Sequence, residues 1–212
     1  MQIQYFINDI PDDFEFIGDL AIDTEAMGLK LQRDRLCVIQ IADANKKVCL
    51  IHFPDNNYNY ECKNLKKYLL NKDIQKIFHF GRFDISIIRK YLNIDEIQNV
   101  YCTKIASRFT RTYTDSHSLR SLVGEIMKID LKKEQQCSYW GAQNLSEAQK
   151  TYAANDVIYL HDIRNALNKI LEKYNRTEIA NKFFQFLNNI CTADLLDFNE
   201  DIFRHTDRDF KN

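Results

Sequence analysis

Three short segments carry side chains that could perform hydrolytic chemistry. Asp23 and Glu25 stand two residues apart at the end of an apolar run, so a strand would point both carboxylates the same way, roughly 7 Å apart. Asp84 follows a second apolar run, while Tyr152 and Asp156 have the spacing of four that makes two side chains neighbours on a helix. Clustered carboxylates are the ligands that hard divalent cations prefer. If folding brings the segments together, they predict an acidic metal site.

Each segment has another interpretation when it is taken alone. The pair of Asp23 and Glu25 also fits the solvent face of a strand. Asp84 also fits the first turn of a helix, where a carboxylate caps free N–H groups and complements the helix dipole. Tyr152 also fits a half-buried packing tyrosine. The metal-site hypothesis therefore depends on the occurrence of all three segments in one chain.

Strands in the first half of the chain and helices in the second half would position these segments. Apolar runs and helical periodicity predict an α/β domain in which helices flank a mixed β-sheet. A capping-type serine at Ser146 predicts a helix that starts at Glu147 and continues past Leu167. Strands are expected over 16–23, 36–42, 48–52 and 74–80, and the other helices over 63–70, 82–92, from 103 onward, over 119–127 and over 179–191.

Composition narrows the class of protein. The chain has 212 residues, of which 45% are apolar and 28% are charged, as expected for one ordinary domain. Its formal charge of −1 means that nucleic-acid binding needs a local basic surface. No apolar run approaches the ~20 residues of a membrane helix, and the first residues lack a signal-peptide pattern, so we expect a cytoplasmic protein without a membrane partner. The six cysteines lack metal-ligand spacing and are expected to be reduced core residues.

The ordered set of segments resembles the DEDD 3′–5′ exonucleases of the tyrosine subclass, and within them ribonuclease D. The resemblance covers about residues 15–168, in the segments 23–29, 33–42, 79–84, 103–108, 117–125 and 152–156. It implies a ribonuclease H-like mixed sheet, with the exonuclease domain over 1–175 and a C-terminal helical extension and tail over 176–212. Phe80 stands where many superfamily members have Asn. Full-length ribonuclease D continues into helical domains of the HRDC type, so a short single-domain form is expected here.

The chemistry that this resemblance implies is phosphodiester hydrolysis with two Mg²⁺ or Mn²⁺ ions per active site. Asp23, Glu25, Asp84 and Asp156 would hold the ions, with Asp23 between them. Two ions about 3.5–4 Å apart activate water and stabilise the leaving oxygen. Tyr152 would orient the attacking water, because a phenol of pKa ~10 is a poor general base. The expected reaction releases nucleoside 5′-monophosphates from RNA 3′ ends, in stable-RNA or tRNA 3′ processing.

Substrate contacts are expected from apolar and basic residues around the acidic segments. The resemblance places Ala26, Met27, Gly28 and Leu29 at the terminal nucleotide, although Met27 and Leu29 also fit a core. Arg33 and Arg35 are additional candidates. Trp140 stands in a loop that could flank the substrate, although packing is the expected role. The expected partner is a single-stranded RNA 3′ end, bound by a monomer or a homodimer. The further candidate substrate-binding residues are Arg82 and His79, although a structural role is the more common one for such a histidine. Lys104, Arg108 and Arg111 join them, because their spacing fits one helical face, although a charged face of this kind is usually just solvated.

Three alternatives remain open at this point. A DNA 3′–5′ exonuclease would use the same residues on a different polymer. A catalytically silent nucleic-acid-binding protein would keep the fold, but such proteins usually lose one or more of the acidic ligands, and all four stand here. A phosphatase with Asp-x-Asp chemistry requires a second aspartate, and Glu25 stands at that position.

Overall fold

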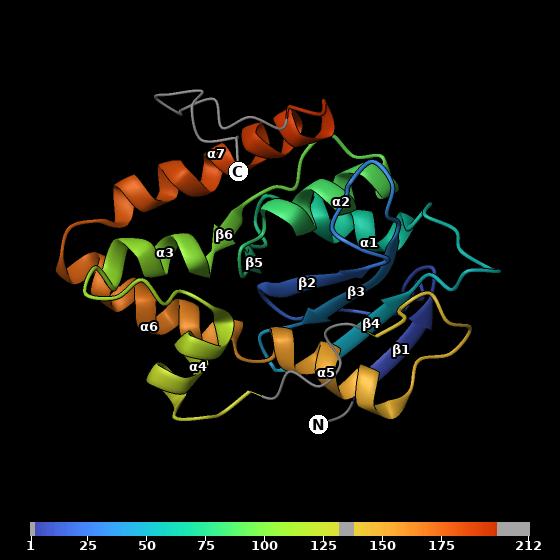
Figure 1. The fold of residues 1–212 in the computed structure, drawn as a ribbon, viewed down its shortest axis with the longest axis horizontal. Coiled ribbons are helices and arrows are strands. Elements are labelled where there is room, and N and C mark those ends of the chain that lie inside the picture. Colours follow the sequence, from blue (N-terminus) through green and yellow to red (C-terminus); the bar gives the residue numbers. More distant parts are fainter. Residues whose placement is uncertain (1–2, 132–137, 199–212) are drawn as a thin grey trace, which may run out of the picture.

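The computed structural model describes residues 3–131 and 138–198, and within them a six-stranded sheet in the order β1-β4-β3-β2-β5-β6 (Figure 1). β3 runs antiparallel to both of its neighbours, β2 and β4, whereas the other adjacent strands are parallel. The sheet is therefore mixed, as predicted. The strands are β1 (Ile3–Ile7), β2 (Leu20–Ala26), β3 (Leu36–Ala42), β4 (Val48–His52), β5 (Lys76–Phe78) and β6 (Val100–Cys102).

The two edge strands were not predicted from the sequence. β1 carries partly exposed side chains and β6 has three residues, so neither shows the continuous apolar run that marks a central strand. β3, by contrast, is buried along its whole length, and its apolar run was read correctly. The predicted strand over 74–80 is shorter than expected, because β5 comprises three residues.

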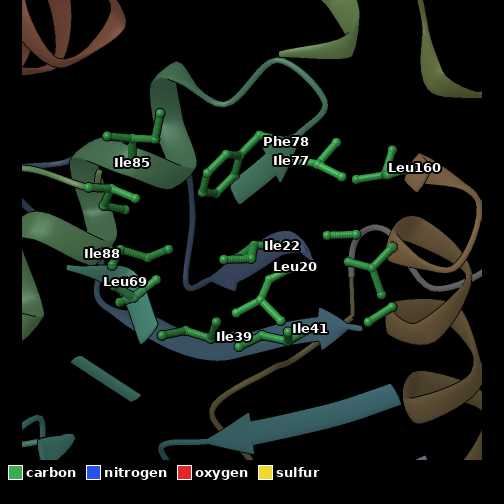
Figure 2. Packing of buried hydrophobic residues seen from close by; sticks show 14 of the residues in the cluster. Leu20, Ile22, Ile39, Ile41, Leu69, Ile77, Phe78, Ile85, Ile88 and Leu160 are labelled. Atoms are coloured by element: carbon green, nitrogen blue, oxygen red, sulfur yellow. The ribbon is translucent and has the colours of Figure 1, made fainter. Parts of the chain in front are cut away.

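Two layers of helices cover the sheet. The side chains of Leu20, Ile22 and Ile39 pack with those of α1 and α2, including Ile85 (Figure 2). On β2, Asp23 alternates with these residues and faces α5, which contacts β2, β3 and β4. The helices are α1 (Lys63–Leu69), α2 (Arg82–Leu92), α3 (Thr103–Thr110), α4 (Leu119–Met127), α5 (Glu147–Val157), α6 (Leu160–Lys173) and α7 (Thr177–Leu195).

The long helix predicted from Glu147 past Leu167 is two helices. α5 ends at Val157, a turn at Ile158 and Tyr159 follows, and α6 begins at Leu160. α5 packs on the sheet whereas α6 packs on α3, so the chain changes direction between two different partners. Neither glycine nor proline stands at the turn, and the sequence therefore carries no local signal for it.

Three other expectations concerned the cysteines, membrane-spanning helices and the C-terminal extension. Five of the six cysteines are free and buried, as predicted, and Cys137 lies outside the described residues. Within residues 3–131 and 138–198, no helix combines the length and the apolar character that crossing a membrane requires. Residues 199–212 of the predicted C-terminal extension lie outside the described residues, and α7 forms its described part.

Candidate active site

β2 presents two acidic side chains on the face that α5 covers. Asp23 and Glu25 point to this face, and Thr24 between them points to the opposite face. Asp23 pairs with Gln40 of β3 in the antiparallel ladder, and the Gln40 amide Nε2 donates a hydrogen bond of 2.7 Å to Asp23 Oδ2. The strand pair therefore fixes the orientation of the first carboxylate.

α5 brings a third carboxylate to the same place. Its N-terminus is fixed by a capping box between Ser146 and Gln149, so the phase of the helix is set before it reaches the sheet. Asp156 stands near the other end of α5. Asp23, Glu25 and Asp156 each offer one carboxylate oxygen, and these three oxygens lie within 4.8 Å of one another. The predicted convergence of the first and third segments is thus present.

Asp84 reaches the site from the other side of the sheet. It lies in the first turn of α2, is 6% exposed, and accepts a hydrogen bond of 2.6 Å from Thr24 Oγ1. Asp84 is consequently not one of the three carboxylates whose oxygens lie within 4.8 Å. It still lies close enough for its charge to raise the pKa of Asp23 and that of Glu25. The structure brings the four acids together as a triad with a fourth member behind Thr24.

The electrostatics of this cluster disfavour negative charge. Burial is the largest cause for each acid: it raises the pKa of Glu25 to about 9, with Asp156 and Asp84 adding to the rise. Burial raises the pKa of Asp156 to about 7, which a hydrogen bond from Tyr152 opposes. Burial also raises the pKa of Asp84 to about 6, against the Thr24 hydrogen bond, and that of Asp23 well above its ordinary range. Confined like charges of this kind call for a cation.

The donor set fits a hard divalent cation. All the side chains that converge are carboxylates, which Mg²⁺ and Mn²⁺ prefer, and no cysteine or histidine joins them. Among the described residues, no lysine or arginine forms an ion pair with Asp23, Glu25 or Asp156. The negative charge of the cluster is therefore left for a bound ion to neutralise.

Tyr152 stands one helical turn before Asp156 and faces the cluster. Burial and the charges of Asp156 and Glu25 raise the pKa of its phenol, so the hydroxyl stays protonated and acts as a donor. The ring of Trp140 lies 6.1 Å from that of Tyr152, centroid to centroid, and Trp140 is 2% exposed. Trp140 thus serves packing, as predicted, in the wall that holds Tyr152.

A cleft of about 700 Å³ opens above the carboxylates. It contains four of the five catalytic candidates, and it also contains five of the residues that were expected to contact substrate. Its apolar walls and acidic floor suit a nucleotide whose base meets the walls while its phosphate meets bound cations. The lining residues are Asp23, Thr24, Glu25, Ala26, Met27, Gly28, Leu29, His79, Phe83, Leu119, Ser138, Trp140, Tyr152 and Asp156.

Arg82 lies in a neighbouring cleft. This second cleft, of about 510 Å³, shares Leu29 and Phe83 with the first. Arg82 Nε and a terminal nitrogen bind both carboxylate oxygens of Asp194 on α7, at 2.7 and 2.6 Å. The guanidinium is therefore engaged with α7. Arg33 lines the same cleft and pairs with Asp34.

The three basic residues expected on one helical face do not share one environment. Arg108 is exposed, and Lys104 Nζ lies 3.8 Å from the centroid of the Phe80 ring. Arg111 lies beyond the last residue of α3, is 2% exposed, and binds Glu125 and the Ser116 carbonyl. Because its donors are engaged inside the protein, the expectation of a phosphate-binding face that includes Arg111 is wrong. Arg35 is likewise engaged, with Asp55.

Sequence reasoning missed several residues of the site. Gln40 is a polar residue in the middle of an apolar strand, which is a signal that could have identified it as a partner of a functional group. Thr24 and Phe83 stand inside the quoted motifs but were given no role. Leu119 stands inside the quoted segment 117–125 and was likewise given no role, and Ser138 reaches the cleft through tertiary folding.

Comparisons with known proteins match this chain to one family model and to several curated relatives. A family model described as 3′–5′ exonuclease matches residues 6–172. Ribonuclease D of Bartonella henselae is 31% identical over 158 residues, which cover 74% of this chain and 38% of the relative. DNA polymerase I of Aquifex aeolicus is 31% identical over 155 residues, which cover 71% of this chain and 24% of the relative. The chain thus spans well under half the length of these curated relatives.

A solved nuclease matches nearly the whole chain. Brucella melitensis NrnC superposes with a TM-score of 0.89 at 41% identity, covering 97% of this chain and 100% of that chain. NrnC has also been solved with bound Mg²⁺ and bound to pGG. The predicted fold class and the predicted resemblance to ribonuclease D-like exonucleases are both confirmed.

Proposed function

The chain belongs to the 3′–5′ exonuclease family, and from this premise we propose that it is an exoribonuclease that releases nucleoside 5′-monophosphates from RNA 3′ ends. The observation that carries the proposal is the convergence of Asp23, Glu25 and Asp156, with Asp84 behind them, beside Tyr152 in one cleft. A binding protein would have no use for four clustered acids, three of them half-buried and Asp84 buried, whose mutual repulsion destabilises the fold.

We assign the four acids to the binding of two divalent cations, Mg²⁺ or Mn²⁺. When bound, such ions activate water and stabilise charge on the phosphate and the leaving oxygen. Asp23 suits a shared ligand, since Gln40 holds one of its oxygens in place. Thr24 fixes Asp84 by a hydrogen bond. The structure supports the triad directly, and the ion count is a proposal.

Tyr152 is proposed to position the attacking water. Its hydroxyl keeps its proton, because burial and the neighbouring carboxylates raise the pKa of the phenol. A protonated phenol beside Asp156 donates a hydrogen bond and does not remove a proton from water. The contribution of Tyr152 is therefore orientation.

The residues after Glu25 are proposed to hold the terminal nucleotide. Met27 and Leu29 are exposed apolar side chains, 41% and 83% accessible, and both line the cleft. The core alternative for these two residues does not apply, because core residues are buried. Apolar contacts to base faces are tolerant of sequence, as an exonuclease that meets every base requires.

The substrate class is RNA with a free 3′ end. Escherichia coli RNase D is described as an exoribonuclease involved in structured RNA processing, which supports the proposal of stable-RNA or tRNA 3′ processing, whereas the pGG bound to Brucella NrnC supports very short RNA as the substrate. A length series of oligoribonucleotides, from two to twenty nucleotides, distinguishes these substrates by their kcat/KM. Similarity to a DNA polymerase I makes a DNA 3′–5′ exonuclease the second candidate.

Labelled oligonucleotides test the proposal. With a 5′-labelled RNA and Mg²⁺, we expect a ladder of products that shortens from the unlabelled end, and with a 3′ label we expect a labelled mononucleotide. Asp23→Asn should abolish both. Internal cleavage products, or activity that survives Asp23→Asn or excess EDTA, would refute the assignment. The same sequence as DNA separates the two candidates.

A further inference from the structure

His79 is a half-buried residue that lines the acidic cleft. It follows β5 directly and lines the same cleft as Asp23 and Tyr152. Its ring nitrogen Nδ1 lies 2.9 Å from Thr103 Oγ1, at the start of α3. The hydroxyl of Thr103 in turn donates a hydrogen bond of 3.1 Å to the carbonyl of Phe78. Thr103 is completely buried, so water cannot substitute for either partner.

This chain of hydrogen bonds determines which ring nitrogen carries the proton. A threonine hydroxyl has one proton, and Thr103 uses it on the Phe78 carbonyl. The contact between Thr103 and His79 Nδ1 therefore needs the proton on Nδ1. In a neutral imidazole the other nitrogen, Nε2, is then a bare acceptor. No hydrogen bond to Nε2 is formed by the residues of 3–131 and 138–198.

The surroundings keep the imidazole neutral. Burial, the ammonium of Lys104 and the ring of His117 lower the pKa of His79 to about 3. A protonated ring would present a donor on Nε2 and would attract phosphate. The neutral ring presents an acceptor, and phosphate oxygens are acceptors too, so the ring has no hydrogen bond to offer to phosphate.

The donors of a nucleic-acid end are ribose hydroxyls and base N–H groups. The N–H groups of the bases differ from base to base. A contact to one of them would therefore not serve an enzyme that removes every nucleotide. The 2′-hydroxyl is present on each ribonucleotide and absent from DNA. We propose that His79 Nε2 accepts a hydrogen bond from the 2′-hydroxyl of the bound ribose and so selects RNA over DNA. The inference rests on the proposed exonuclease function.

Matched substrates measure this contact. We compare kcat/KM for an oligoribonucleotide and for the same RNA with 2′-fluoro groups on its two 3′-terminal nucleotides, which keep an electronegative 2′ substituent but cannot donate. The wild-type protein should favour the RNA by about tenfold, as the loss of one hydrogen bond to a partner left unpaired predicts. In His79→Ala the ratio should fall to about one.

Substitutions at Thr103 provide the matched control. Thr103→Val keeps the shape and removes the oxygen that fixes the proton on Nδ1, so the ratio should fall toward one. Thr103→Ser restores that oxygen and should restore the ratio. A fold that merely needs a well-packed residue at position 103 would show no such rescue. Because the substrate modification is made with wild-type protein, the test does not depend on any variant folding.

The outcomes separate this inference from the proposed function. Equal rates on both substrates by the wild-type protein, or an unchanged ratio in an active His79→Ala, would overturn the role of His79. Loss of rate on a 3′-deoxy substrate, with none on the 2′-fluoro substrate, would overturn it as well. If the protein hydrolysed neither RNA nor DNA, the proposed function would be refuted. The role of His79 would then be decided by binding measured in EDTA, as the ratio of the affinity for the RNA to the affinity for its 2′-fluoro analogue.

Discussion

Removing one charge from the acidic cluster should stabilise the metal-free protein while abolishing activity. The informative change is Asp156→Asn, which keeps the shape of the side chain. Burial raises the pKa of Asp156 from its ordinary value near 3.8 to about 7. The folded protein therefore binds a proton that the unfolded chain releases, and folding becomes less favourable as the pH rises between these values.

The magnitude follows from the size of the shift. Each pKa unit corresponds to about 1.4 kcal/mol, so the full shift is worth about 4 kcal/mol above pH 7 and about 1.6 kcal/mol at pH 5. Asparagine does not titrate. Relative to the wild type, the free energy of unfolding of Asp156→Asn should therefore rise by about 2–3 kcal/mol between pH 5 and pH 8. Comparing two pH values cancels any constant effect of the substitution, such as the altered bond to Tyr152.

Urea unfolding in EDTA at both pH values measures this difference. Asp162→Asn is the matched control, because Asp162 is a partly exposed acid on α6 that pairs with Lys46 and lies outside the cluster. This control removes an acid and leaves the four acids of the cluster in place, so it should not reproduce the gain seen for Asp156→Asn. Added Mg²⁺ should stabilise the wild type, by about 2.7 kcal/mol at a hundred times its Kd, and Asp156→Asn much less. If the stability of Asp156→Asn relative to the wild type did not rise between pH 5 and pH 8, the cluster would not disfavour negative charge as inferred here.

Three further predictions concern neighbouring residues. Tyr152→Phe should lower kcat by about 10²-fold in single-turnover measurements with little change in RNA affinity, since its hydroxyl orients water; an equal loss of affinity would contradict that role. Arg111→Met should lower the free energy of unfolding by about 3 kcal/mol, because it leaves the Ser116 carbonyl and Glu125 without their partner, while Arg108→Ala should change only the RNA affinity and its salt dependence. Gly141→Ala should cost about 1–3 kcal/mol in urea unfolding, because an added Cβ would lie 2.5 Å from an oxygen of Asp55; an unchanged midpoint would show that this contact yields freely.

Much of the candidate site could be read from local patterns. Alternation along a strand placed Asp23 and Glu25 on one face, and the helical spacing of Tyr152 and Asp156 placed these two together. Both rules depend on backbone geometry alone, so the tertiary structure does not change which side chains share a face. The long apolar run of β3 also predicted its strand correctly, because a run of this length is too short for a typical buried helix and fits a strand that is buried on both faces.

Other features depended on packing that no local pattern carries. The break after α5 occurs because α5 and α6 have different partners, and its residues are ordinary helix residues. Arg111 has the spacing of a surface residue but lies past the end of α3, where Glu125 of α4 binds it. The approach of Asp84 from the opposite face of the sheet required the parallel pairing of β5 with β2, which the sequence does not specify.

The most direct measurement is the location of bound metal. Crystals soaked in Mn²⁺ should show two anomalous-scattering peaks about 3.5–4 Å apart at the cluster of Asp23, Glu25 and Asp156. Asp23→Asn should lose both peaks. A cluster that stays without metal at millimolar Mn²⁺, or a metal bound elsewhere while RNA is still hydrolysed, would contradict the account.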